Sequence, residues 1–125
     1  MKKTFIAIIC SMLMLLTNTL HAQSKLDPDK CPSIEAIKAL GLNWAEEIDH
    51  QVWAVGHSAD AYDTNMKWVF YMGKFPAKNR DDAISVVGKI ALMNLKFFHG
   101  PEKNSAEKWV CVYYSNNIPA VTVTS

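Results

Sequence analysis

The sequence has little of what marks several large classes of protein. It contains only five glycines, and they form no glycine-rich loop of the kind that holds a phosphate group. Its 13 Lys and Arg residues almost balance its 12 Asp and Glu residues, so the formal net charge is +1. Such a neutral chain points to neither nucleic acid nor an anionic membrane surface as a partner. With 125 residues, it has room for one domain with one modest core.

Long apolar runs are also scarce, and the one that is present lies near the N-terminus. Lys2 and Lys3 precede an apolar run over residues 5–16, and a short polar stretch then ends at Ala22. This order is typical of a secretory signal peptide, and the run is shorter than the roughly 20 residues of a membrane span. We therefore expect cleavage after Ala22, a flexible lead-in over residues 23–30, and an exported mature chain without a membrane segment, either periplasmic or secreted.

Cysteine is rare as well. Of the three cysteines, Cys10 falls in the leader, so the mature chain keeps Cys31 and Cys111. Two cysteines in an oxidising compartment are best interpreted as one disulfide, and closing a loop of about 80 residues is worth about 4–5 kcal/mol by the chain-entropy estimate. The alternatives are weaker, because a catalytic thiol needs a neighbouring base and a zinc site needs more ligands at tighter spacing.

The mature chain alternates helical and β-prone segments within a single domain over residues 31–125. Helices are expected over residues 32–40, which end before Gly41, and over residues 79–97, which Asn79 opens as an N-cap. Strands are expected at three β-prone segments and, more weakly, at a fourth: 52–55, 66–72, 109–114 and 118–124. This order predicts an α+β fold in which a mainly antiparallel sheet of three or four strands packs with two helices.

Two of these segments carry predictions about packing. Side chains alternate along a strand, so Cys111 shares a face with Trp109 and Tyr113, and that face should meet the first helix. In the second helix, apolar residues recur at spacings of three and four, which predicts a buried stripe: Ala83, Val86, Val87, Ile90, Met93 or Asn94, and Phe97. Ile84 and Leu95 lie off this stripe, so we expect the helix to be apolar over more than a narrow face.

Few side chains could carry catalysis. The densest group of possible metal ligands lies at residues 46–50, followed by His57 and Asp60, but the odd separation of His50 and His57 would place them on opposite faces of one strand. A solvated acidic loop explains this group better than a metal site. Ser58 also lacks the strand–turn–helix context of a nucleophilic serine. We therefore expect no enzyme, with a small hydrolase or an enzyme inhibitor as an alternative.

Aromatic residues are the stronger candidates for function. Four tryptophans and four tyrosines are present, and most of them should belong to the core. A sheet with helices on one side only would leave some rings exposed, and exposed aromatic patches commonly mark binding surfaces. The candidates for such a surface are Trp53, Trp68 and Tyr71. The sequence thus predicts a non-enzymatic interaction protein, whose partner is an unidentified protein or small ligand.

Several motifs together resemble a known family. The Cys-Pro pair before the first helix, the KWVFYM segment and the W-x-C-x-Y motif at residues 109–113 resemble a family of small exported gamma-proteobacterial proteins that includes a hemin-binding protein. The resemblance implies export, a disulfide and a haem-related or host-facing role. A haem site needs an axial His or Tyr in an apolar pocket, and no C-x-x-C-H attachment motif is present. The candidate ligands are His50, His57, His99, Tyr113 and Tyr114.

Overall fold

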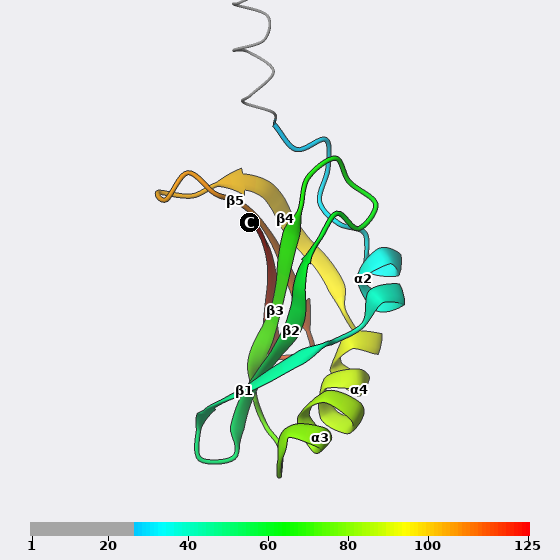
Figure 1. Cartoon of the computed structure of the whole chain (residues 1–125), viewed down its shortest axis with the longest axis vertical. Coiled ribbons are helices and arrows are strands. Elements are labelled where there is room, and N and C mark those ends of the chain that lie inside the picture. The colour runs from blue at the N-terminus through cyan, green and yellow to red at the C-terminus, as the bar shows by residue number, and fades with distance from the viewer. Residues whose placement is uncertain (1–26) are drawn as a thin grey trace, which may run out of the picture.

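The fold is built on one antiparallel sheet, as a computed structural model that describes residues 27–125 shows. The strands are Trp44–Asp49 (β1), Val52–Asp60 (β2), Trp68–Pro76 (β3), Lys96–Lys103 (β4), Trp109–Ser115 (β5) and Ile118–Thr124 (β6). They lie in the order β1-β2-β3-β6-β5-β4, and the helices cover one face of the sheet only (Figure 1). The predicted α+β fold is confirmed, but the sheet has six strands instead of three or four. The expected leader, residues 1–22, lies outside the described residues.

Two strands were missed by the sequence analysis because their stability comes from their partners. The first two residues of β4, Lys96 and Phe97, lie where the second helix was expected to end, and the rest of the strand lies beyond that helix. The helix instead ends at Met93, and the Phe97 ring packs edge-on against Tyr113 of β5, with ring centroids 5.6 Å apart. β1 likewise pairs with β2. Such cross-strand contacts decide strand formation more than the local preference of the segment does.

Both helical segments begin at a side-chain N-cap, of which only Asn79 was predicted. Helix α2 spans Ile34–Leu40, and the Ser33 hydroxyl accepts a hydrogen bond from the Ala36 backbone N–H at 3.1 Å. The second helical segment comprises α3 (Arg80–Asp82), a π-helical turn, η1 (Ala83–Val87), and α4 (Gly88–Met93). The Asn79 side chain accepts from the Asp82 N–H at 2.9 Å, which confirms Asn79 as the N-cap.

The predicted buried stripe of the second helix is wrong at three positions. Val86 is exposed by 50%, Ile90 by 58% and Met93 by 64%. Ala83 of the predicted stripe is buried, and the rest of the buried side is formed by Gly88, Ala91 and Leu92. A π-helical turn holds more residues than an α-helical turn, so η1 rotates the residues after it away from the positions that an α-helical spacing predicts.

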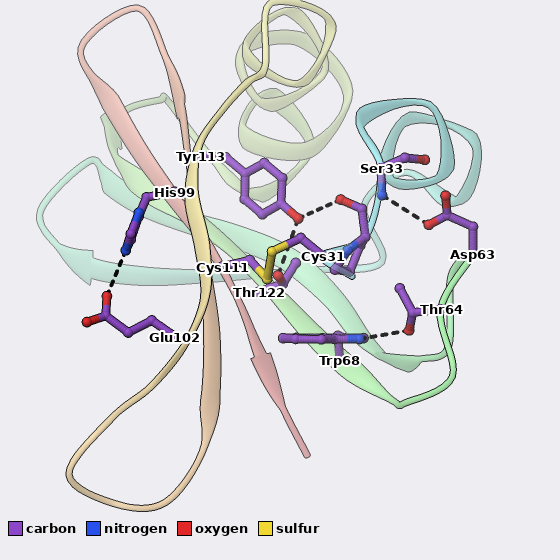
Figure 2. The surroundings of a disulfide bond; sticks show 11 residues. Cys31, Ser33, Asp63, Thr64, Trp68, His99, Glu102, Cys111, Tyr113 and Thr122 are labelled. Carbon is purple, nitrogen blue, oxygen red and sulfur yellow. Dashed lines mark hydrogen bonds and ion pairs between the residues drawn. A yellow bond between two sulfur atoms is a disulfide. The ribbon is translucent and has the colours of Figure 1, made fainter. Parts of the chain in front are cut away.

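The predicted disulfide between Cys31 and Cys111 is confirmed, with Cα atoms 5.9 Å apart (Figure 2). Next to it, the Tyr113 hydroxyl donates to the Pro32 carbonyl at 2.6 Å, and Tyr113 is buried. These two links hold the chain before α2 against one face of β5. The Cys111 face of this strand therefore meets the segment that leads into the first helix.

The described part of the lead-in is held by the loop between β2 and β3. The Asn65 side chain donates to the Asp27 carbonyl at 3.1 Å, and the Asp63 carboxylate accepts from the Ser33 backbone N–H at 3.0 Å. Desolvation by itself raises the pKa of Asp63, but the hydrogen bonds from Ser33 and the nearby Lys30 outweigh it and leave that pKa below its ordinary value. This loop thus fixes where α2 begins.

Removing the disulfide tests how strongly it stabilises the fold. The double variant Cys31→Ala/Cys111→Ala should lower the free energy of unfolding by about 4–5 kcal/mol, because the unfolded chain regains the freedom that the closed loop removes. Urea unfolding of this variant, of the oxidised protein and of the reduced protein measures the effect. The reduced protein should match the variant, and a loss below about 1 kcal/mol would contradict the estimate.

Tyr113 predicts how stability depends on alkaline pH. Burial raises the pKa of Tyr113 to about 12, above the value of about 10 in the unfolded chain. The folded state therefore keeps the proton longer, so this contribution is complete below pH 10 and is lost as the pH rises from 10 to 12. Between pH 9 and 12, the free energy of unfolding should fall by about 2 kcal/mol more in the unmodified protein than in Tyr113→Phe. Tyr62, whose pKa burial and then Asp60 also raise, is common to both proteins. Equal losses in the two proteins would refute the role of Tyr113.

Candidate functional site

The candidate site is the face of the sheet that the helices leave uncovered. In β3, β5 and β6, alternate side chains point away from the helices, and register pairs them across strands: Val69 with Val123, and Tyr71 with Val121. We call this surface the open face. Its central side chains are Val69, Tyr71, Val110, Val112, Tyr114, Val121 and Val123.

The open face is apolar where a solvated sheet is normally polar. Strand β6 points Val121 and Val123 outward, whereas the buried side chains on its inner side include Thr122 and Thr124. An antiparallel sheet with one solvated face usually shows the reverse pattern, with apolar residues inside and polar residues outside. Strand β6 therefore has the composition of a strand that is covered on both of its faces.

Trp44 extends the open face across β2 onto the edge strand β1. Its ring packs edge-on against Tyr71 of β3, with centroids 5.3 Å apart, although β2 lies between the two strands. The ring can reach because Gly56 separates them, and a Cβ atom at this position would collide with the indole of Trp44. Glycine at position 56 is thus what allows the aromatic surface to continue to β1.

A shallow groove of about 590 Å³ lies at the end of the open face, near the turn between β5 and β6. Phe98 is 70% exposed there and packs edge-on against Tyr114, with centroids 6.2 Å apart. His99 is the register partner of Val112, one of the groove residues, so it points to the same face of the sheet. The groove residues are Phe98, Val112, Tyr113, Tyr114, Asn116, Asn117, Ile118 and Pro119.

Most of the charged side chains on this face of the sheet lie at its edges. Glu46 of β1 pairs in register with Ala54, whereas Lys96 and Glu102 of β4 pair with Tyr114 and Val110, so β1 carries an acid and β4 carries a base and an acid. The outward positions of β3, β5 and β6 between these edges are occupied by valine and tyrosine, except for Gly73 and Pro119, which line a hollow together with Lys74. An apolar centre with a charged rim is the usual composition of a protein interface.

The three aromatic residues that the sequence analysis assigned to a surface have different positions. Tyr71 lies on the open face and is 45% exposed. Trp53 is half-buried on the helix-covered face, where its register partner is Phe75. Trp68 is fully buried, and its indole N–H donates to Thr64 at 2.9 Å (Figure 2), so the prediction that it forms part of a surface is wrong.

The valines of the open face were missed by the sequence analysis. Valine and threonine alternate along residues 121–124, and this pattern predicts a strand with one valine face and one threonine face. The pattern alone did not reveal that threonine, the polar residue, faces the core.

The structure does not gather the five candidate haem ligands at one place. Tyr113 is buried in the core, His50 follows the last residue of β1 in the turn to β2, and His57 lies on the helix-covered face. Only His99 and Tyr114 share the open face. The His99 imidazole is 2.9 Å from the Glu102 carboxylate (Figure 2). Within residues 27–125, no group of three or more His, Cys, Asp or Glu side chains is placed to hold a metal ion.

Comparisons with known proteins place this architecture in a family. No helix within the described residues 27–125 is both long and apolar enough to span a membrane. The searches of curated proteins and of solved structures returned no match. A family model described as "Domain of unknown function (DUF4949)" matches residues 30–124, which include both cysteines, α2, α4 and the whole sheet. The chain therefore belongs to the DUF4949 family.

Proposed function

We propose that this protein is an exported, non-enzymatic interaction protein that binds a protein partner through its open face. The observation that carries the proposal is the polarity of β6, where valine points outward and threonine points into the core. Burying these valines against a partner removes apolar surface from water, which is the main favourable contribution to protein association.

The shape of the open face favours a protein over a small molecule. Its apolar side chains extend over β3, β6 and β5, and the ring of Trp44 continues it to β1. Small-molecule sites are usually concave and surround their ligand, whereas protein interfaces spread over a broad area with aromatic residues near the centre. Tyr71, exposed among the valines, occupies such a central position.

Export is supported by the disulfide. Cys31 and Cys111 are joined in the structure, and such bonds persist in oxidising compartments and are rare in a reducing cytoplasm. A periplasmic or secreted protein with this bond agrees with the leader expected at residues 1–22.

Site-specific photocrosslinking tests the proposed interface. A benzophenone amino acid replaces Tyr71 on the open face or, as a matched control, Ile90, an exposed apolar residue on α4. In cells that naturally export the protein, position 71 should give a discrete adduct that Val121→Lys reduces at least about tenfold, because a charge would then have to be buried in the interface. Position 90 should give no such adduct.

Two outcomes would refute this interface. One is the absence of an adduct at position 71, and the other is an adduct at position 71 that persists in Val121→Lys. Retention of the disulfide and of the circular dichroism spectrum shows that the variant still folds.

A second candidate function is hemin binding, favoured by the common position of His99 and Tyr114. Both lie on the open face of adjacent strands, beside an apolar groove with the exposed ring of Phe98. A phenol and an imidazole are axial ligands that haem iron accepts, and the apolar groove suits the porphyrin ring. His99 would have to leave Glu102 to act as a ligand, so Tyr114 is the better placed of the two.

A hemin titration separates this candidate from the first. Hemin added to micromolar protein should shift the Soret band, and Tyr114→Phe should abolish the shift or raise the apparent Kd at least about tenfold. His50→Ala and His57→Ala, which lie away from the groove, serve as controls and should leave the shift unchanged. No shift, or an equal shift in the Tyr114→Phe/His99→Ala double variant, would eliminate hemin binding at this groove.

A further inference from the structure

We propose that the partner of the open face is a second copy of this chain, related to the first by a twofold axis parallel to the central strands. This inference rests on the proposed function, since it names the partner of the same surface. It is carried by the order in which residues succeed one another across the open face.

Backbone register arranges the open face in rows that cross the strands from β1 to β4. One row consists of Trp44, Gly56, Tyr71, Val121, Val112 and His99. The next row, closer to the β1–β2 turn, begins with Glu46, Ala54 and Gly73 and ends with Pro119, Tyr114 and Lys96. This second row thus has an acid at its β1 end and a base at its β4 end.

A twofold axis parallel to the strands pairs these opposite charges. Such an axis keeps each row at its height but reverses its direction, so that β1 of one copy lies over β4 of the other. Glu46 then faces Lys96 of the second copy, and the symmetry repeats this pair at the other edge. An axis perpendicular to the strands would place β1 over β1, which contains no basic residue, so Glu46 would have no base opposite it. The pairing of Glu46 with Lys96 therefore favours the parallel axis.

The same axis also matches the centre of the face with itself. Reversal of the first row places Tyr71 over Val121 of the second copy, and Gly56, which has no side chain, over Val112 of the second copy. Large side chains thereby meet smaller ones, as in packed sheets, whose layers lie about 10 Å apart. The outward side chains of β3, β6 and β5 in these rows carry no charge, and Lys74, in the β3 bulge beside Gly73, is exposed at the hollow near Pro119.

The area of the open face predicts a reversible dimer. Six strands spaced about 4.8 Å apart give the face a width of about 24 Å. Strands of about six residues, at about 3.3 Å per residue, give it a length of about 20 Å, so its area is about 500 Å² per copy. The two copies together then bury about 1,000 Å², which is at the small end of specific interfaces. We therefore expect a dimer that dissociates on dilution in the micromolar range.

Charge reversal tests this arrangement with the purified, oxidised full chain. Sedimentation equilibrium should show a monomer–dimer equilibrium, and Glu46→Lys or Lys96→Glu should each raise its Kd at least about tenfold, because each change places like charges opposite each other twice. The double variant Glu46→Lys/Lys96→Glu restores opposite charges and should return the Kd to within about threefold of the unmodified protein. Glu47→Lys is the matched control, because Glu47 follows Glu46 in β1 and points to the other face.

Zero-length carbodiimide crosslinking of a mixture of ¹⁴N- and ¹⁵N-labelled protein locates the contact. The expected product joins Glu46 of one isotope to Lys96 of the other. The inference is overturned by a chain that stays monomeric at high concentration, by a dimer that Val121→Lys leaves intact, or by single reversals that the double variant does not rescue.

These failures are distinguishable from failure of the proposed function. If the purified chain is monomeric while position 71 still crosslinks in cells to a different protein, the open face binds another partner and only the second-copy inference fails. If neither assay detects a contact at the open face, both proposals fail.

Discussion

The covalent and hydrogen-bonded links between the start of α2 and β5 determine which side of the sheet is inside. The Cys31–Cys111 disulfide and the hydrogen bond from Tyr113 to Pro32 hold one face of β5 against the helical layer. Since side chains alternate along a strand, the same links turn Val110, Val112 and Tyr114 outward. Register then extends this choice to β6 and β3, so the polarity of the whole sheet follows from one attachment.

The result is a fold of two layers, a sheet and a helical layer. The sheet has the composition of a sheet that is covered on both faces. The helices bury one apolar face and leave a second one without a covering element. The two proposed uses of this second face exclude each other in part, because Tyr114 belongs both to the hemin groove and to the row that a second copy would cover. Hemin bound at the groove would therefore compete with dimer formation, and the two proposals concern one surface with alternative occupants.

Features governed by local chemistry could be predicted from the sequence, and those governed by distant partners could not. The Asn79 cap and the shared face of Cys111 and Tyr113 follow from a few neighbouring residues. The disulfide could be predicted because only two cysteines lie outside the expected leader. Strand β4 could not be predicted, because it depends on its pairing with β5 more than on the local preference of its residues. The π-helical turn displaced part of the expected stripe. The aromatic surface was expected at Trp53, Trp68 and Tyr71, of which only Tyr71 lies on the open face, and Trp44 was not expected there. A single sequence does not state which of two apolar strand faces the helices will cover.

The central claim is that a second copy of the chain covers the open face. Hydroxyl-radical footprinting of the purified chain over a range of concentrations measures this directly, because it reports the solvent exposure of individual side chains. Oxidation of Tyr71 and Tyr114 should fall as the chain self-associates, while Met93 on the far side of the molecule should remain equally reactive. Unchanged oxidation of both tyrosines at concentrations far above the micromolar range, or protection confined to Met93, would contradict the claim.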